Sequence, residues 1–118
     1  MVTEQQVSAW VNGYEQAWHS NTRKDVAALF TPQAEYHEWP YGTDWIGRAA
    51  IIEGWRSRAP WQEGGWHFTW TLLTINGDTA AIQGTGRYKK LGAFANLWTV
   101  TFEDNGKFSM FRMWHNQV

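Results

Sequence analysis

The sequence contains no cysteine, and this absence removes several classes of protein at once. A disulfide framework, a zinc site built on thiolates and a cysteine nucleophile are all excluded. The lack of cysteine is compatible with a reducing compartment. A chain of 118 residues fits one domain, residues 1–118. At that size it buries about two-thirds of its unfolded surface and needs no disulfide or metal to stay folded.

Neither sign of charge is in excess. Ten Lys and Arg stand against 11 Asp and Glu, for a net charge of −1, so the basic stripe of a nucleic-acid binder is missing. The first residues, MVTEQQVSAW, are acidic and polar rather than a signal peptide. No apolar run approaches the roughly 20 residues of a membrane span. We expect a soluble, cytoplasmic protein that binds neither nucleic acid nor membrane.

The sequence also lacks the short motifs that mark common cofactor sites. There is no phosphate-binding loop, no glycine-rich dinucleotide fingerprint and no serine nucleophile elbow. The run HEWPY, from His37, lacks the second histidine of the zinc motif H-E-x-x-H. We therefore expect no cofactor and no metal.

Tryptophan, in contrast, is abundant, with 10 residues. Part of this surplus is expected to fill the core. Tryptophan is nevertheless large and carries a polar N–H, and surplus Trp and Tyr side chains are typical of pockets that hold flat organic molecules.

Two helices are predicted at the start of the chain. Thr3 and Gln6 form the two sides of a capping box. Thr22 is placed to begin a second helix, and Pro32 follows its end. The apolar positions of the first helix recur at helical spacing; they are Val7, Trp10, Val11, Tyr14, Ala17 and Trp18.

The rest of the chain is predicted to hold one strand, one helix and a four-stranded meander. The strand covers residues 34–39 and ends at Pro40, and the helix runs from about Gly47 to Pro60. Gly54 inside that helix indicates close packing against another element. Asn-Gly pairs at 76–77 and 105–106 are strong hairpin signals. The predicted order is α-α-β-α-β-β-β-β in an α+β fold.

The hairpin turns also predict which side chains face inward. For the first hairpin, one face is apolar (Trp66, Phe68, Trp70, Leu72, Ala80, Ile82) and the other polar (His67, Thr69, Thr71, Gln83, Thr85, Arg87). For the second, a three-residue loop predicts that Asn96, Trp98, Arg112 and Trp114 share the inner face. A two-residue loop would reverse the last strand, because a slip of one residue moves every side chain to the other face.

Taken in order, these elements resemble the nuclear-transport-factor-2-like superfamily, in its SnoaL-like and ketosteroid-isomerase-like branch. The likeness lies in YEQAWHSN followed by DVAALFTPQAEYHE, in IGRAAI, and in FANLW and DNGKFSMFRMWHN. It implies a bent antiparallel or mixed sheet wrapped around the long N-terminal helix as a cone-shaped half barrel. An open hydrophobic pocket and a homodimer through the outer sheet face are implied as well. A flat, weakly charged outer face is also typical of a dimer surface.

The resemblance carries over to a few positions only. Asn96, Trp98, Arg112 and Trp114 match family positions, whereas Met113 and Asn116 stand where many relatives carry acids. Those two carboxylates are therefore missing as candidate bases.

The first strand supplies the candidates for chemistry. Alternation places Glu38 with Tyr36 on one face and His37 with Trp39 on the other, so either orientation turns a titratable group inward. A carboxylate in an aromatic cavity has a raised pKa, which suits acid–base catalysis near neutral pH. Glu38 and His37 are the catalytic candidates. The ligand-binding candidates are Tyr14, Tyr36, Trp39, Trp70, Asn96, Trp98, Arg112 and Trp114.

Three functions remain open from the sequence. The first is a cofactor-free isomerase, cyclase or dehydratase acting on a hydrophobic carbonyl-containing or polycyclic compound, with Asn96 and Arg112 steadying the oxyanion. The second is a non-catalytic binding protein for an aromatic ligand. The third is a dimeric accessory module. Polar groups inside a deep cavity would favour the first function. A cavity lined only by aromatic residues, with Glu38 and His37 facing water, would favour the second, and a filled cavity with a broad apolar outer face would favour the third.

Overall fold

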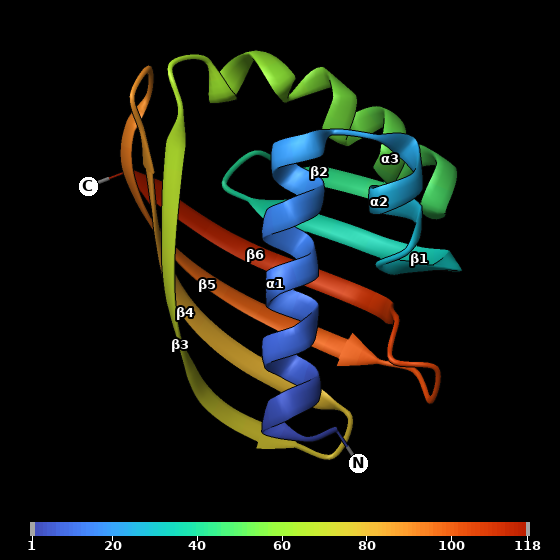
Figure 1. Cartoon of the computed structure of the whole chain (residues 1–118). Helices are drawn as coiled ribbons and strands as arrows, with labels where there is room; N and C mark the ends of the chain where they lie inside the picture. The colour runs from blue at the N-terminus through green and yellow to red at the C-terminus, as the bar shows by residue number, and fades with distance from the viewer. Residues whose placement is uncertain (1, 118) are drawn as a thin grey trace.

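A computed structural model describes residues 2–117 as helices packed against one curved sheet (Figure 1). Its elements are α1 (Glu4–Ser20), α2 (Arg23–Ala27), β1 (Phe30–Trp39), β2 (Thr43–Ile46), α3 (Arg48–Ser57), a 3₁₀ turn η1 (Ala59–Gln62), β3 (Trp66–Asn76), β4 (Thr79–Tyr88), β5 (Gly92–Phe102) and β6 (Phe108–Gln117). The predicted α+β class and order are confirmed. The structure adds the short strand β2 and η1, which the sequence did not predict.

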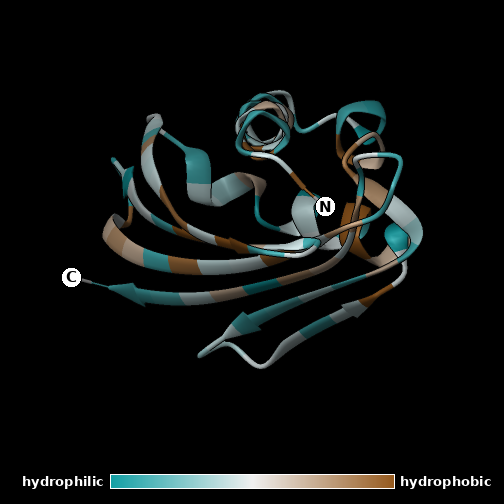
Figure 2. Cartoon of the chain, turned by 90° about the horizontal axis from the view of Figure 1, so that it is seen from below, coloured by the Kyte–Doolittle hydropathy of each residue, from teal (hydrophilic) through white to brown (hydrophobic). Residues whose placement is uncertain are grey.

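The six strands form one mixed sheet in the order β2-β1-β6-β5-β4-β3. Strands β1 and β6 are parallel, and the other neighbours are antiparallel. The sheet curves around α1, which lies across its concave side, as the view along the helix in Figure 2 shows. Helix α3 lies at the β1–β2 end. This is the predicted bent sheet wrapped around a long N-terminal helix.

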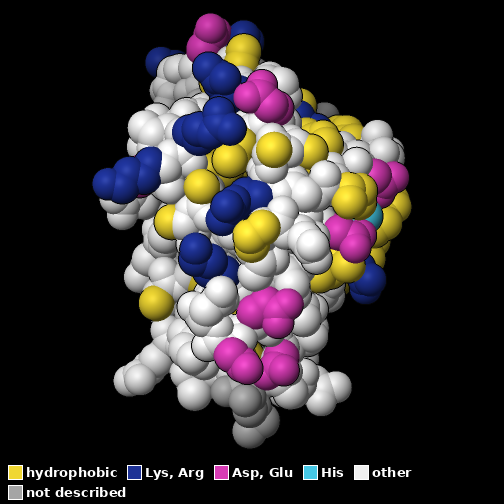
Figure 3. All heavy atoms as spheres, turned by 90° about the vertical axis from the view of Figure 1, so that its right-hand side faces the viewer, with side chains coloured by type: hydrophobic (Ala, Val, Ile, Leu, Met, Phe, Trp, Pro, Cys, Tyr) yellow, Lys and Arg dark blue, Asp and Glu magenta, His cyan; other side chains and the backbone are white. Residues whose placement is uncertain are grey.

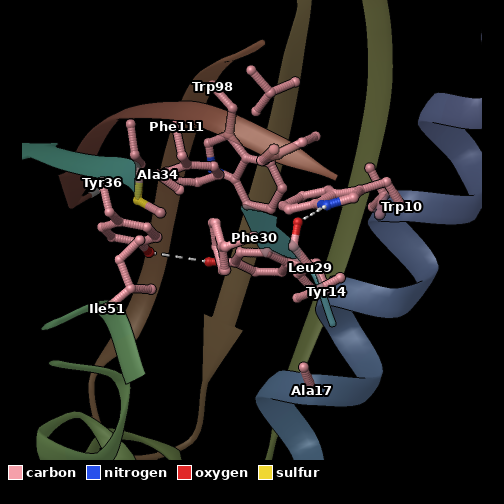
Figure 4. Close-up of a cluster of buried hydrophobic side chains, with 14 of the residues drawn as sticks. Trp10, Tyr14, Ala17, Leu29, Phe30, Ala34, Tyr36, Ile51, Trp98 and Phe111 are labelled. Atoms are coloured by element: carbon pink, nitrogen blue, oxygen red, sulfur yellow. Dashed lines mark hydrogen bonds between the residues drawn. The ribbon is translucent and has the colours of Figure 1, made fainter. Parts of the chain in front are cut away.

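Helix α1 begins where the capping residues place it. The Thr3 side chain accepts a hydrogen bond from the Gln6 backbone N–H, and the Gln6 side chain accepts one from the Thr3 N–H. Its predicted apolar positions are all buried. They meet the aromatic core drawn in Figure 4, where the Trp10 indole donates a hydrogen bond to the Leu29 carbonyl oxygen at 3.2 Å.

Two glycines allow close approaches in this core. A Cβ at Gly54 of α3 would lie 2.4 Å from the Trp45 ring, and one at Gly84 of β4 would lie 2.4 Å from the Phe68 ring. Phe68 thereby stacks on Trp98 at 5.0 Å. The predicted close packing at Gly54 is confirmed, and Trp45 is the partner that requires it.

The first hairpin has the predicted faces. Phe68 pairs with Gly86 and Trp70 with Gly84 on the inner side, whereas Thr69 and Thr71 are exposed on the outer side. Asn76 pairs directly with Thr79, and a bulge after Leu72 restores the alternation.

The second hairpin differs from the predicted one. Phe102 pairs with Phe108, and a bulge then shifts the register so that Thr101 pairs with Met110. Phe108 and Phe111 both face the core as a result, and each is fully buried. The prediction that Arg112 and Trp114 share the inner face with Trp98 is wrong, because this bulge turns both side chains to the outer face. Met113 and His115 take the inner positions, opposite Trp98 and Asn96.

The surface carries both signs of charge. On the face shown in Figure 3, Lys and Arg side chains gather in the upper and middle part with some Asp and Glu side chains among them, and a cluster of Asp and Glu side chains lies in the lower part. Among residues 2–117 no helix is long and apolar enough to cross a membrane.

Candidate functional site

A small cavity lies between α1, the end of α3 and the inner face of the sheet. Its volume is about 30 Å³, which is room for one or two water molecules. Most of its walls are aromatic; the lining residues are Tyr14, Trp18, Tyr36, Glu38, Trp45, Trp55, Arg58, Trp61, Tyr88, Met113 and His115. An organic molecule of any size would therefore have to displace some of these side chains.

Glu38 is the acidic group of this cavity. Strand β1 turns Tyr36 and Glu38 inward, and Glu38 is 5 % exposed. One carboxylate oxygen lies 2.9 Å from the Arg58 Nη2 atom. Burial raises the pKa of the carboxyl group above its usual range; Arg58 opposes that shift but does not cancel it. Glu38 is thus a buried carboxyl group whose charge depends on one cation.

Arg58 itself lies at the junction between α3 and η1. Its guanidinium carbon lies 4.2 Å from the centre of the Trp61 ring, 5.1 Å from Trp45 and 5.6 Å from Tyr41. The Nη2 atom also donates a hydrogen bond to the Thr43 hydroxyl at 3.3 Å. Three rings and one carboxylate therefore surround a single cation.

Two phenols lie deeper in the cavity. The hydroxyl groups of Tyr14 and Tyr36 are 3.4 Å apart (Figure 4). Burial raises the pKa of both Tyr14 and Tyr36 well above the ordinary value for a phenol. Both therefore keep their protons at neutral pH and serve as hydrogen-bond donors.

His115 is the buried imidazole at the edge of the cavity. It stacks on Phe94 at 4.2 Å, and its Nδ1 atom lies 2.7 Å from the Tyr41 hydroxyl. Burial, with a smaller contribution from Arg58, lowers the pKa of His115 to about 4. The imidazole is thus neutral at pH 7 and shares a hydrogen bond with the Tyr41 hydroxyl through Nδ1.

This depressed pKa predicts a loss of stability in acid. Between about pH 6.5 and pH 4 the unfolded chain takes up a proton at His115 that the folded chain does not, so the free energy of unfolding falls as pH falls. We expect His115 to account for about 2 kcal/mol of this loss. His115→Gln should remove that part, as measured by urea unfolding across this pH range.

The exposed His67 provides the control. His67→Gln should leave the acid dependence as it is in the wild type. An unchanged acid dependence in His115→Gln would contradict the neutral, buried imidazole.

The structure brings together only some of the residues predicted for the site. Glu38, Tyr14 and Tyr36 line the cavity. Asn96, Trp98 and Trp70 lie on the inner face but line other parts of the core, where Asn96 and Trp98 are buried and Trp70 is half-buried. The Asn96 side-chain oxygen and the Trp98 indole N–H are buried without a hydrogen-bond partner.

The remaining predicted residues lie on the outer face. His37 contacts Asp44 and Glu35 through its two ring nitrogens, at 2.5 and 3.0 Å. Trp39 stacks on Trp114 at 5.1 Å, and both rings are exposed. The parity of β1, which the sequence left open, therefore excludes His37 and Trp39 from the cavity. The bulge in β6 excludes Arg112 and Trp114.

Sequence reasoning missed three important parts of the site, Arg58, Trp61 and His115. The run Arg58-Ala59-Pro60-Trp61 follows a helix end, and an Arg three residues before a Trp in such a segment was the available signal. Among the described residues, no group of three or more His, Asp or Glu side chains could hold a metal ion.

Comparison with known proteins identifies relatives of this fold. A family model described as a SnoaL-like domain matches residues 11–114. A protein of unknown function with a cystatin-like fold from Methylobium petroleophilum is 18 % identical, with a TM-score of 0.78 over 97 % of this chain and 78 % of that one. No curated protein matches the chain in sequence.

Two further structures are similar. A candidate ketosteroid isomerase from Kribbella flavida is 18 % identical, with a TM-score of 0.74 over 97 % of this chain and 80 % of that one. A protein with a ketosteroid-isomerase-like fold from Catenulispora acidiphila, in complex with trimethylamine, is 20 % identical, with a TM-score of 0.73 over 95 % of this chain and 85 % of that one. At these identities the likeness establishes the fold alone.

Proposed function

The chain belongs to the SnoaL-like domain family, and we propose that within it the chain is a cofactor-free enzyme that transfers a proton, of isomerase, cyclase or dehydratase type. The fold also serves proteins that only bind ligands, so the proposal depends on the site. The observation that carries it is the inward Glu38, buried among aromatic rings with a raised pKa.

Glu38 has the properties of a general acid or base. A carboxyl group transfers protons efficiently when its pKa lies near the working pH, and burial moves Glu38 in that direction. Arg58, at 2.9 Å, holds the carboxylate form in the absence of substrate. A substrate that moves Arg58 aside would free the carboxylate oxygen that Arg58 now contacts, so that this oxygen can act as the base.

Tyr14 and Tyr36 would stabilise the negative charge that develops during proton transfer. Their protonated hydroxyl groups are 3.4 Å apart and share a wall of the cavity with Glu38. Donors that are already oriented in a water-poor site stabilise an enolate oxygen more strongly than water does. This role replaces the one predicted for Arg112, which faces outward, and for Asn96, which lies outside the cavity.

The substrate is proposed to be a small carbonyl compound with an apolar body. A cavity of about 30 Å³ opens to a molecule of a few carbon atoms if the Arg58 side chain moves, but it is a poor fit for a polycyclic compound. The trimethylamine in the Catenulispora protein supports a small organic ligand.

Proton abstraction can be measured before the product is known. When the protein is incubated in D₂O with a panel of small ketones and aldehydes, deuterium should enter the carbon next to the carbonyl of the accepted compounds. We expect Glu38→Gln to slow this exchange at least about 100-fold, because the base is lost while the shape of the cavity is kept. NMR or mass spectrometry of the recovered compound gives the rate.

His37→Gln is the matched control, because it changes the neighbouring residue on the outer face of the same strand. Its exchange rate should equal that of the wild type. If no compound of the panel exchanges above the rate of buffer, the catalytic proposal fails and a non-catalytic binding protein becomes the better description.

We further propose that the chain forms a homodimer through the outer face of the sheet. Trp39, Trp114 and Leu97 lie side by side on that face through the pairing of β1, β6 and β5, and each is 37–39 % exposed. A row of large apolar side chains on a flat sheet is typical of a surface that a second copy covers.

Sedimentation at concentrations of tens of micromolar should give the mass of two chains. Trp114→Asp should shift the equilibrium toward the monomer, because it places a charge in the middle of this row. A wild-type chain that sediments as a monomer at these concentrations would refute the dimer.

A further inference from the structure

The groups that surround the Arg58 guanidinium are ones that favour a cation. Its nearest neighbours are the faces of Trp61 and Trp45, at 4.2 and 5.1 Å from the guanidinium carbon, and the Glu38 carboxylate. The negative faces of aromatic rings attract cations, and they do so most strongly where water is excluded. Such a set of groups recognises an organic cation by charge and shape, whichever molecule carries it.

Glu38 and Trp45 lie in strands of the sheet, whereas Arg58 does not. Glu38 lies near the end of β1, where it pairs with Thr43 of β2 and Met113 of β6. Trp45 stacks on Tyr36 at 5.0 Å and packs against Gly54. Arg58 instead lies at the junction of α3 and η1, on a long side chain that is 15 % exposed. Trp45 and Glu38 can therefore keep their positions when the Arg58 side chain moves outward.

We propose that the cavity accepts a small organic cation, an alkylammonium group, which takes the place of the Arg58 guanidinium against Trp61, Trp45 and Glu38. The proposal names the substrate class of the proposed function and rests on the same cavity. The substrate is then a small carbonyl compound that carries an alkylammonium group. In the absence of substrate the Arg58 side chain fills the cation position, and the substrate displaces it.

The charges in the cavity favour a cation over the other ligand classes. If Arg58 leaves, Glu38 is the charged group that remains, since His115 is neutral at pH 7 and the phenols keep their protons. An anion would be repelled by that carboxylate, and a neutral molecule would leave it buried without a counter-charge. An alkylammonium ion supplies the missing charge and keeps the contacts with the rings.

Choline and 3,3-dimethylbutan-1-ol provide a direct test, because they have the same shape and differ in charge. Binding to the wild type, to Arg58→Ala and to Glu38→Gln is followed by ligand-observed NMR of the methyl signals and by calorimetry. Neither measurement requires turnover. Arg58→Gln is the second variant, which fills more of the space if Arg58→Ala does not fold.

We expect the wild type to bind choline at least about tenfold more tightly than the neutral alcohol. Arg58→Ala should bind choline about tenfold more tightly than the wild type does, because no tethered cation competes. Glu38→Gln should lose the preference for choline. Trp61→Leu should weaken choline binding more than Trp39→Leu, which changes a ring on the outer face.

Two results would overturn the inference. One is a wild type that binds the alcohol as well as choline, or binds neither. The other is choline binding to Arg58→Ala alone, which would mean that the mutation had created the site. The proposed proton transfer is tested separately by deuterium exchange. If uncharged ketones exchange but choline does not bind, the proposal that the cavity binds an organic cation is refuted and the catalytic proposal still stands.

Discussion

Replacing Arg58 by Met should lower the free energy of unfolding by about 3–5 kcal/mol at neutral pH, because it leaves a buried carboxylate without its cation. Glu38 is 5 % exposed, and Arg58 is the cation paired with it, at 2.9 Å. Methionine fills much of the space of the apolar part of the Arg58 side chain and removes the guanidinium that lies over Trp61 and Trp45. The lost free energy of unfolding therefore measures the effect of removing the charge. Urea unfolding followed by circular dichroism gives this free energy.

The pH dependence of this variant identifies Glu38 as the cause. Without Arg58 the folded-state pKa of Glu38 rises further above its unfolded value, because the positive charge that counteracted the effect of burial is gone. Between the unfolded-state pKa and the higher folded-state pKa of Glu38, the folded chain keeps a proton that the unfolded chain has released. The free energy of unfolding therefore falls as pH rises through this interval. The difference between wild type and Arg58→Met should thus be smallest in acid and grow toward neutral pH.

A double variant completes the comparison. Glu38→Gln with Arg58→Met removes both charges and should be more stable at neutral pH than Arg58→Met alone, with a net loss below about 2 kcal/mol. If Arg58→Met costs less than about 1 kcal/mol at every pH, the pair is an ordinary surface ion pair. Glu38 would then be in contact with water, and the catalytic proposal would lose its main support.

The parts of the fold that sequence could predict are those fixed by local rules. The capping box at Thr3 and Gln6, the apolar face of α1 and the faces of the first hairpin each follow from spacing within one or two elements. Strand β2 was missed because its four residues follow Gly42, which indicates a turn. Its stability comes from pairing with β1, a contact that no local pattern expresses.

The site was less predictable because its parts come from distant segments. Alternation correctly grouped Glu38 with Tyr36, but it could not say which face of β1 meets the core. The surroundings of Arg58 combine β1, the β1–β2 turn, β2 and η1, and the other walls of the cavity come from α1, β4 and β6, so the site exists only once these segments have packed together. The abundance of tryptophan pointed to an aromatic cavity, but none of the four tryptophans predicted to line it does so.

Phe111 and Trp114 test the corrected register of β6, and we expect very different effects from truncating them. Phe111 is fully buried and stacks on Tyr36 at 4.5 Å, so Phe111→Ala should cost about 3–5 kcal/mol. Trp114 is 37 % exposed and stacks on Trp39. Trp114→Ala should cost less than about 1.5 kcal/mol, although tryptophan is the larger side chain. Urea unfolding at two protein concentrations separates this cost from any loss of dimer.

The physical basis of that difference is the bulge between Thr101 and Phe102 in the pairing of β5 with β6. Without it, alternation from the hairpin turn would bury Arg112 and Trp114 and expose Phe111 and Met113. A guanidinium would then lie beside Trp98 in the core with its charge unpaired, whereas the bulge places it in water. If Trp114→Ala were instead the more costly change, the result would support a pairing of β5 with β6 that has no bulge. It would also remove His115 from the cavity, so the measurement decides the composition of the site as well as the register of the strand.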